Sequence, residues 1–368
     1  MNLTFITIVI IKKFQKSKDN SKKICNLKFS KCYQRWSMSK TKQLTIFSIF
    51  FILCWINVFS QQLNYTITTV GKHSDEVLGV FVNEANTKFA TCSLDETIKI
   101  WSLPEGKELM TLKGHLGSVY NISFSGSDQL LVSGSEDETV RIWDIQTGKE
   151  LKVLRGHTGP VIGVYFSQDD QNSMVASTSF DKTVKLWDVA SGSEIKTLRG
   201  HTEATNNVAY SYDGKNIASC SDDSTIRVWS TELKATEPIM VLRGHNAPVL
   251  TVLYSFDSKK IASSDANGEV IIWDARTGQI IRKFKAHNDL VQDISFAEDN
   301  KTLITGSLDK KIRLWDTDGP FLLFEADLGV GIWSVDLVSD ASILVAGCED
   351  GTVRLLKKSV PSQKGKKR

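Results

Sequence analysis

Apolar and polar side chains alternate in short stretches along most of the chain. Val140-Arg-Ile-Trp143 is one example, and a period of two residues is typical of a half-buried β-strand. The runs Val119–Phe124 and Leu130–Gly134 precede this segment, and Glu150–Leu154 follows it. Turns rich in Gly, Asp, Asn and Ser separate the runs. The pattern therefore predicts units of four short strands.

The unit occurs seven times with a period of 41 to 44 residues. In six copies a histidine precedes a tryptophan, by 30 residues in the third copy and by 28 in the other five. The pairs are His73 and Trp101, His115 and Trp143, His157 and Trp187, His201 and Trp229, His245 and Trp273, and His287 and Trp315. The seventh copy has Leu328 and Leu356 at the two positions. A repeat of this length indicates one structural unit per copy.

The repeats predict an all-β, seven-bladed β-propeller over residues 61–357, with four antiparallel strands in each blade. A four-stranded sheet cannot bury both faces alone, so the units are expected to stack radially. The last copy stops at Leu355-Leu356 without an outer strand, whereas the segment from Asn64 to Val70 is spare. We expect this N-terminal strand to pair into the last blade and close the ring, leaving no long free sheet edge.

Each repeat ends in a nearly constant phrase. Ser135-Glu-Asp137-Glu-Thr-Val-Arg-Ile-Trp143-Asp is one copy, and Ser179-Phe-Asp181-Lys-Thr-Val-Lys-Leu-Trp187-Asp is the next. The whole phrase in fixed register closely resembles the WD-repeat family, over about residues 62–357. The resemblance implies a propeller that binds peptides or proteins on its narrow face, around the central channel. It also implies a hydrogen-bonded His, Ser, Asp and Trp tetrad that ties the loop entering a blade to its inner hairpin.

Five repeats carry the full set of tetrad residues that the resemblance implies. The tetrads are His73, Ser93, Asp95 and Trp101; His115, Ser135, Asp137 and Trp143; His157, Ser179, Asp181 and Trp187; His201, Ser221, Asp223 and Trp229; and His287, Ser307, Asp309 and Trp315. A buried carboxylate requires donors, which these partners supply. Ser, His and Asp also make hydrolase triads, but five sets in one chain indicate a structural role.

The remaining two repeats depart from this pattern. Blade five has Asp265 at the Ser position and Asn267 at the Asp position, and blade seven keeps only Asp350 of its tetrad. We therefore expect blades five and seven to be less stable against local unfolding than blades two and three. All six histidines belong to the repeats, and no metal-ligand cluster, Walker loop or dinucleotide fingerprint is present. The sequence thus favours a protein that is not an enzyme and holds no cofactor or metal.

Two sets of positions are expected to point toward the narrow face around the channel. The first set lies five residues after the His position of each repeat, at Leu78, Tyr120, Ile162, Asn206, Leu250, Gln292 and Trp333. The second set directly precedes the turn-Asp position of each repeat, at Leu94, Glu136, Phe180, Asp222, Ala266, Leu308 and Glu349. Tyr120, Phe180 and Trp333 are the best candidates, because aromatic side chains dominate binding hot spots. The alternative is that they pack between blades. Glu136, Asp222 and Glu349 favour a neutral or basic peptide.

The charge of the chain is unevenly distributed. Residues 61–356 carry 28 basic and 41 acidic side chains, so a general nucleic-acid-binding role is disfavoured. The basic end Lys364-Gly-Lys-Lys-Arg368 is interpreted as a solvated tail of a propeller domain that ends at residue 357. Cys92, Cys220 and Cys348 are expected to be buried free thiols without a disulfide framework.

The first sixty residues contain a candidate leader. Leu44–Ser60 is uncharged and mostly apolar, follows Lys40 and Lys42, and is short for a membrane span. We interpret residues 38–60 as a signal peptide starting at Met38, residues 1–37 as an upstream extension of the reading frame, and Gln61 as the mature start. The alternatives are an uncleaved anchor and an intracellular protein. Free thiols argue mildly against export.

The leading hypothesis is an exported scaffold, secreted or periplasmic, that binds a protein or peptide. It would be a monomer within a complex, without nucleic acid and without membrane contact after leader cleavage. The first rival is a cytoplasmic or nuclear adaptor subunit of a chromatin, splicing or ubiquitin-ligase type of complex, with a wrongly assigned N-terminus. The second is an enzyme with its active site in the channel, which would require clustered carboxylates beyond Asp293 and the acidic rim.

Overall fold

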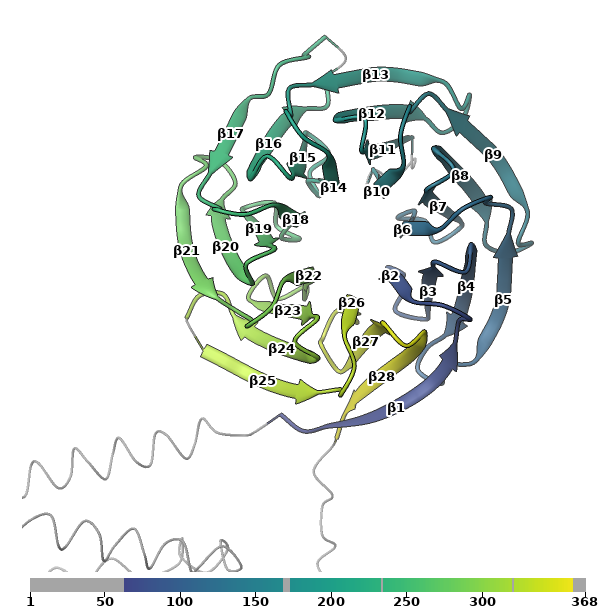
Figure 1. Ribbon diagram of the computed structural model, residues 1–368, viewed down its shortest axis with the longest axis vertical. Helices are drawn as coiled ribbons and strands as arrows, with labels where there is room; N and C mark the ends of the chain where they lie inside the picture. The colour runs from purple at the N-terminus through teal and green to yellow at the C-terminus, as the bar shows by residue number, and fades with distance from the viewer. Residues whose placement is uncertain (1–62, 168–172, 233, 320, 360–368) are drawn as a thin grey trace, which may run out of the picture. The chain divides into compact units, whose positions relative to one another are not determined.

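A computed structural model of the protein describes residues 63–167, 173–232, 234–319 and 321–359. Within these residues, seven four-stranded antiparallel sheets surround a central channel (Figure 1), which confirms the predicted all-β, seven-bladed propeller. The predicted leader, residues 1–60, and the basic end from residue 360 lie outside the described residues.

Each blade runs from an inner strand at the channel to an outer strand at the circumference. Blade one contains β2 (Val77–Val82), β3 (Lys88–Ser93), β4 (Thr97–Ser102) and β5 (Glu108–Lys113); blade two β6 (Val119–Phe124), β7 (Leu130–Ser135), β8 (Thr139–Asp144) and β9 (Glu150–Arg155); blade three β10 (Val161–Phe166), β11 (Met174–Ser179), β12 (Thr183–Asp188) and β13 (Glu194–Arg199); and blade four β14 (Thr205–Tyr210), β15 (Asn216–Ser221), β16 (Thr225–Ser230) and β17 (Met240–Arg243). Blade five contains β18 (Val249–Tyr254), β19 (Lys260–Asp265), β20 (Glu269–Asp274) and β21 (Ile280–Lys285); blade six β22 (Val291–Phe296), β23 (Thr302–Ser307), β24 (Lys311–Asp316) and β25 (Phe321–Asp327); and blade seven β26 (Ile332–Leu337), β27 (Ile343–Cys348), β28 (Thr352–Lys358) and β1 (Tyr65–Lys72).

The two ends of the propeller meet inside blade seven. β1 pairs antiparallel with β28, from Tyr65 opposite Lys358 to Lys72 opposite Thr352. The spare segment before the first His therefore closes the ring, as the sequence predicts. Tyr65 also contacts the neighbouring blade, because its ring centroid lies 4.6 Å from that of Phe324.

The hydrophobic core is divided among the seven interfaces between blades. Buried side chains form seven clusters, and each cluster joins two adjacent blades. Cys92, Cys220 and Cys348 are buried in these clusters as free thiols, as predicted. Because every cluster needs both neighbours, a single blade cannot bury its apolar faces alone.

A hydroxyl group links the histidine and the tryptophan within a blade. In blade two, Ser133 Oγ accepts the indole N–H of Trp143 at 2.8 Å and lies 2.7 Å from Nε2 of His115. Nδ1 of His115 lies 3.0 Å from Asp137. A neutral imidazole with its proton on Nδ1 satisfies every group in this chain of bonds. The equivalent hydroxyls in blades one and three to six belong to Thr91, Ser177, Ser219, Ser263 and Thr305.

The serine assignment of the predicted tetrads is therefore wrong, whereas the His, Asp and Trp assignments agree with these contacts. The register of β7 and β8 places Trp143 opposite Leu131, so Ser133 is within reach of the indole and Ser135 lies four residues away, about 13 Å along the strand. Ser135 instead donates to the Gly117 carbonyl and accepts the Asp137 amide. The serines that bind the turn in this way are Ser93, Ser135, Ser179, Ser221 and, through the amide of its turn Asp, Ser307.

Protonation of these networks favours unfolding at acid pH. Burial acts to raise the pKa of Asp137, but hydrogen bonds from His115, Thr139 and the Leu116 amide hold it well below its usual range. Burial lowers the pKa of His115 and lowers that of His287 to about 4. The folded state thus binds fewer protons than the unfolded chain. The stabilisation that these groups give the folded state is lost as the pH falls below their pKa values in the unfolded chain. These values are about 6.5 for histidine and about 4 for aspartate.

Blade five has a complete network, contrary to the sequence-based expectation. Asp265 lies 2.8 Å from Nδ1 of His245, and Ser263 bridges His245 and Trp273. The Asp265 carboxylate also accepts the backbone amides of Asn267 and Glu269. Asp265 therefore supplies the carboxylate from a position two residues earlier. This removes the reason to expect low local stability in blade five.

Blade seven replaces its network with apolar packing. Leu328, Ala346 and Leu356 occupy the His, bridging-hydroxyl and Trp positions, and all three are buried in one core cluster. Asp350 still accepts the amide and hydroxyl of Thr352, at 2.9 and 2.6 Å. Because the three polar groups are replaced together, no buried donor or acceptor of the network is left without its partner. The exchange therefore costs less stability than the removal of a single member of the network. The lower local stability expected for blade seven stays a prediction.

Turns on the face opposite the His loops bind one another around the ring. In each described link a backbone amide donates to the turn of a neighbouring blade. The amide of Glu84 donates to Asp128 between blades one and two, that of Asp213 to Ser258 between blades four and five, and that of Asp257 to Asn300 between blades five and six. The amide of Glu298 donates to the Ser339 carbonyl between blades six and seven, and that of Ser339 to Asn86 between blades seven and one. Blades are thus tied together outside the apolar core as well.

We predict that Ser133→Ala destabilises the propeller more than Ser135→Ala. The first change strands the His115 and Trp143 nitrogens in the core and should cost about 2–4 kcal/mol, whereas the second removes one turn interaction and should cost about 1 kcal/mol. Urea unfolding monitored by tryptophan fluorescence measures both values. Equal losses would contradict the bridging role of Ser133.

Asp265→Ala should destabilise blade five as much as Asp137→Ala destabilises blade two, by about 3 kcal/mol, because each leaves a buried histidine without its acceptor. Asn267→Ala is the matched control at the ordinary carboxylate position and should change stability by less than about 0.5 kcal/mol. Hydrogen exchange in β19 and β20 provides the local readout, and a larger effect of Asn267→Ala would refute the assignment.

Candidate functional site

The first predicted set of narrow-face residues coincides with a β-bulge in every blade. In each inner strand the pairing with the next strand skips the second residue. The skipped residues are Leu78, Tyr120, Ile162, Asn206, Leu250, Gln292 and Trp333, and all are partly exposed. A bulge re-aims a side chain that would otherwise enter the ladder. The bulges therefore give these positions a different orientation from their neighbours in the inner strands.

The second predicted set lies in the turns between the second and third strands. Glu136, Phe180, Asp222 and Glu349 are exposed there, whereas Leu94, Ala266 and Leu308 are partly exposed. The two sets meet in blade four, where Asn206 Nδ2 donates to Asp222 at 2.8 Å and also to the Val249 carbonyl of blade five at 2.9 Å. In this blade the two predicted sets are therefore direct neighbours.

The three aromatic candidates differ in accessibility. Phe180 is 54% exposed, although its amide is fixed by the Pro160 carbonyl. Tyr120 is partly buried, and its pKa is raised by burial and by the nearby Glu136 carboxylate. Trp333 is also partly buried. Phe180 therefore offers the most apolar contact area of the three.

A small acidic cluster surrounds Trp333 where blade seven meets blade one. Burial and the Glu349 and Asp75 carboxylates raise the pKa of Glu76, while the Trp333 indole N–H acts in the opposite direction. This arrangement places negative charge beside the aromatic ring. Glu76 and Asp75 were not among the residues predicted from the sequence to bind a partner.

Leu116 is the most exposed large apolar residue among those described, at 82%, and it is not one of the candidates predicted from the sequence. It follows the tetrad histidine of blade two, and its amide donates to Asp137 at 3.0 Å. The equivalent residues in the other blades are Ser74, Thr158, Thr202, Asn246, Asn288 and Gly329. An apolar residue at a position that is otherwise polar or Gly was the available signal.

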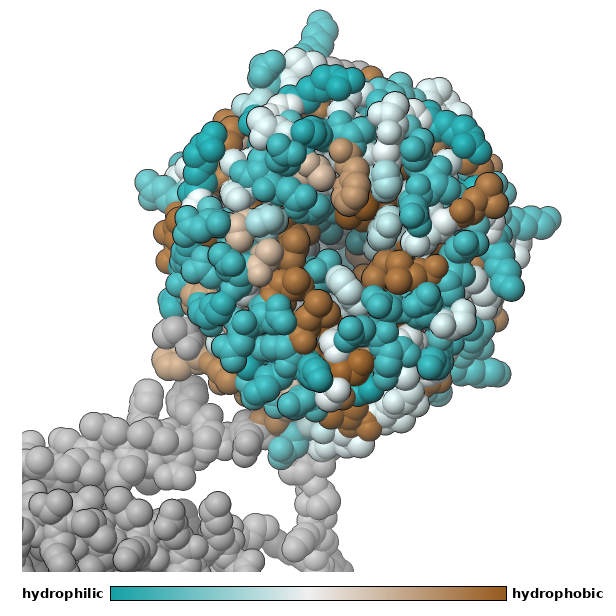
Figure 2. Space-filling view, in the orientation of Figure 1, coloured by the Kyte–Doolittle hydropathy of each residue, from teal (hydrophilic) through white to brown (hydrophobic). Residues whose placement is uncertain are grey.

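Charge on the narrow face is arranged in two rings. Asp75, Glu76, Glu136, Asp222 and Glu349 lie in its loops and turns. Six of the seven outer strands end on this face with an exposed cation, at Lys72, Lys113, Arg155, Arg199, Arg243 and Lys285, whereas β25 ends with Asp327. A partner therefore meets negative potential near the channel and positive potential at the circumference. On the face seen in Figure 2, hydrophobic atoms gather around the channel mouth within a mainly hydrophilic surface.

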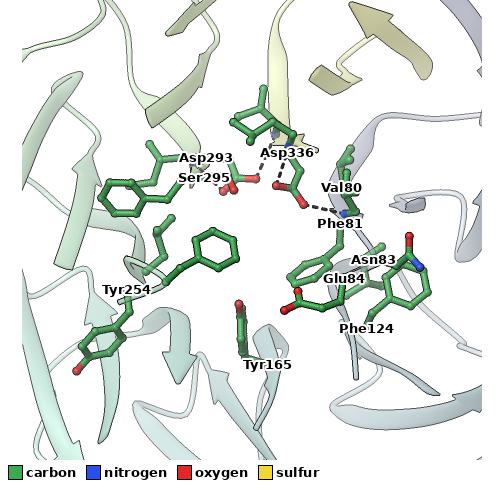
Figure 3. A pocket seen from close by; sticks show the side chains of 18 of the residues that line it. Val80, Phe81, Asn83, Glu84, Phe124, Tyr165, Tyr254, Asp293, Ser295 and Asp336 are labelled. Atoms are coloured by element: carbon green, nitrogen blue, oxygen red, sulfur yellow. Dashed lines mark hydrogen bonds between the residues drawn. The ribbon is translucent and has the colours of Figure 1, made fainter. Parts of the chain in front are cut away.

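The channel holds a cavity of about 130 Å³ lined by carboxyl and aromatic side chains (Figure 3). Asp293 and Asp336 lie in its wall, and both carboxylates accept backbone amides. Sequence reasoning singled out Asp293 but not Asp336. Among the described residues no group of three His, Cys, Asp or Glu side chains could hold a metal ion, and no helix is long and apolar enough to cross a bilayer.

The Ser133, His115 and Asp137 network has the order of a hydrolase triad but lacks an accessible nucleophile. Ser133 is fully buried, and its oxygen already accepts the Trp143 indole N–H. A substrate carbonyl cannot approach a hydroxyl in this position. The repeated network is therefore a structural element of the blades.

Comparison with known proteins agrees with this architecture. The family "WD domain, G-beta repeat" matches residues 64–102, 106–144, 148–188, 192–230, 236–274, 278–316 and 324–356. The chain is 34% identical over 89 residues to mitogen-activated protein kinase kinase kinase A of Dictyostelium discoideum, which covers 24% of this chain and 9% of that protein. It is 38% identical over 61 residues to dynein assembly factor with WD repeat domains 1 of Mus musculus, which covers 17% of this chain and 15% of that protein.

The matched segments of both relatives are short, so their activities and partners do not transfer. The seven family matches, by contrast, follow the seven sequence repeats, each from the outer strand of one blade through three strands of the next, and together cover more than half of the chain. The protein belongs to the WD-repeat family, whose propellers are typically non-catalytic scaffolds for protein interaction.

Proposed function

We propose that this protein is a scaffold that binds a peptide or protein segment on the narrow face, over blades two and three. The observation that carries the proposal is the exposure of two large apolar side chains, Leu116 and Phe180, in loops of adjacent blades on this face. Tyr120 lies in the inner strand of blade two, between these loops in the chain. Exposed apolar side chains rimmed by polar ones are typical of protein interaction sites.

The charge of the narrow face defines the partner more closely. Glu136 and Asp222 favour a neutral or basic segment at the channel mouth, whereas the outer ring of Lys and Arg disfavours a long basic partner. We infer a short central segment with a bulky apolar residue, flanked by neutral or acidic residues. Ile162 of blade three belongs to this contact surface. Leu78, Leu250, Trp333 and Glu349 are further candidate contacts around the channel, on blades one, five and seven.

The enzyme hypothesis has less support. The cavity in the channel is lined by Asp336, Glu84 and Glu298 as well as Asp293. Groups of the neighbouring blade already bind Asp293 and Asp336: Asp293 accepts the Ser334 hydroxyl and the Val335 amide, and Asp336 accepts the Val82 amide. A scaffold role requires no such group to be free. An intracellular adaptor role shares the same narrow face, so the propeller does not distinguish it from an exported scaffold.

We keep export through residues 38–60 as a proposal that rests on the sequence of the leader. N-terminal mass mapping of protein isolated from its native source tests it. A mature chain that begins near Gln61 is the expected result. Recovery of the chain with Met38 still attached would sink the exported-scaffold hypothesis and favour the intracellular adaptor.

Alanine substitution of Tyr120, Phe180 and Trp333 together should weaken partner binding at least tenfold, since hot-spot residues contribute about 2 kcal/mol or more. Leu116→Ala alone should weaken it about threefold to tenfold. Affinity capture from a native extract, followed by titration of the purified partner, measures both effects.

Leu151→Ala is the matched control, because Leu151 is 51% exposed but lies on the outer strand of blade two. It should leave binding unchanged. A partner list and affinity that survive the triple substitution would exclude the narrow-face site.

A further inference from the structure

Three inner strands, β6, β22 and β26, are tied to the next blade by a side chain at the same position of the repeat, Asn121, Asp293 and Ser334. The residues at this position are Gly79, Asn121, Gly163, Asn207, Thr251, Asp293 and Ser334, six residues after each His position. Asn121 Oδ1 accepts the Val164 amide of blade three at 3.3 Å. Asp293 makes the same bond with a carboxylate, because it accepts the Val335 amide of blade seven at 3.2 Å and the Ser334 hydroxyl at 2.5 Å.

A second position, two residues later, behaves in the same way. Ser123 Oγ accepts the Phe166 amide of blade three at 3.3 Å. Asp336 of blade seven accepts the equivalent Val82 amide of blade one at 2.7 Å. Blades two and three are thus joined by neutral groups, whereas blade seven is joined to both of its neighbours through carboxyl groups.

The two carboxyl groups share the channel wall without a cation beside them. Figure 3 shows Asp293 and Asp336 with their carboxyl ends near each other, and with Glu84 and Tyr165 facing the same cavity. The titratable groups that interact electrostatically with the pair are Glu84 after β2, Cys92 in β3, Tyr165 in β10 and Tyr212 after β14. Tyr254 of β18 and Glu298 after β22 also line the cavity. The described residues that line the cavity include no Lys, Arg or His. Two ionised carboxylates in this position would repel each other without a cation to offset the repulsion.

Their acid–base behaviour is consistent with this geometry. Burial raises the pKa of Asp293 to about 7, with the Asp336 charge adding to the effect and the Ser334 and Val335 hydrogen bonds opposing it. Burial likewise raises the pKa of Asp336 to about 6. Near neutral pH the pair therefore exchanges a proton with solvent.

We propose that Asp293 and Asp336 form a proton-dependent clasp on the blade that closes the ring. With a proton on the pair, β26 is held to β22 and to β2 without charge repulsion. When that proton leaves to solvent, two like charges remain in the wall of blade seven, and the attachment of β26 to its neighbours weakens. This inference is independent of the partner proposed for the narrow face.

The direction of the effect is opposite to that of the tetrads. A raised carboxyl pKa means that the folded state binds more protons than the unfolded chain. The contribution of the clasp to stability is therefore largest below about pH 4 and falls as pH rises toward 7. The His and Asp groups of the tetrads lose stability in the other direction, so the two effects are separable.

Hydrogen exchange across pH tests the clasp. After correction for intrinsic exchange rates, protection of β26 relative to β14 should fall about tenfold between pH 5 and pH 8 in the wild type. Asp293→Asn combined with Asp336→Asn should abolish this dependence, since an amide at the equivalent position already makes the same tie in blade two. A ratio that is constant with pH in the wild type, or that changes equally in the double variant, would overturn the proposal.

Ser123→Ala is the matched control, because it removes a neutral tie at the position equivalent to Asp336. It should lower the protection of β10 by the same factor at both pH values. If the double variant does not fold, infrared spectroscopy of the wild type in D2O gives a second measurement. A protonated-carboxyl band that disappears between pH 5 and pH 8 supports the clasp, and the absence of that band at pH 5 would refute it.

Discussion

The pairing of β1 with β28 is the interaction on which the ring depends. Successive blades are linked by the covalent chain, whereas the two ends of the propeller meet through the hydrogen bonds between these strands, from Tyr65 to Lys72. The core clusters on either side of blade seven both include side chains of β1, Tyr65 in one and Val70 in the other. Opening this pairing would expose two clusters at once, those on either side of blade seven.

Blade seven is held in a different way from the others. It has no His and Trp network, and Leu328 and Leu356 bury apolar surface instead. Its inner strand is attached to both neighbours by Asp293, Ser334 and Asp336, and its Ser339 turn binds blades six and one on the opposite face. Blade seven thus lacks the network that stabilises a single blade elsewhere. It makes interactions that hold blades six, seven and one together instead.

Much of the fold was accessible from the sequence because it is repeated. The strand number, the blade number and the closing strand all followed from the period and from one incomplete copy. The bridging hydroxyl was misassigned because Ser133 and Ser135 both precede the turn, and only the register opposite Trp143 distinguishes them. Asp265 was misread for a related reason, since a carboxylate can reach the same histidine from two positions in the chain.

The candidate site was less predictable than the fold. Positions around the channel were found by counting from each histidine, but the exposure of Leu116 depends on how its loop leaves the blade. The proximity of Asp293 and Asp336 could not be read from the repeat, because the two residues occupy different positions in different copies. Contacts between copies depend on the ring geometry, which a pattern within one copy does not contain.

The bulge in each inner strand has an evolutionary consequence. Its extra residue takes no part in the regular pairing of the strand, so side chains as different as Leu78, Asn206 and Trp333 occupy it while the residues on either side keep the same register. Mutations at seven such positions can alter what the protein recognises while leaving the ladder that folds it intact. A ring built this way can diversify its ligands one blade at a time.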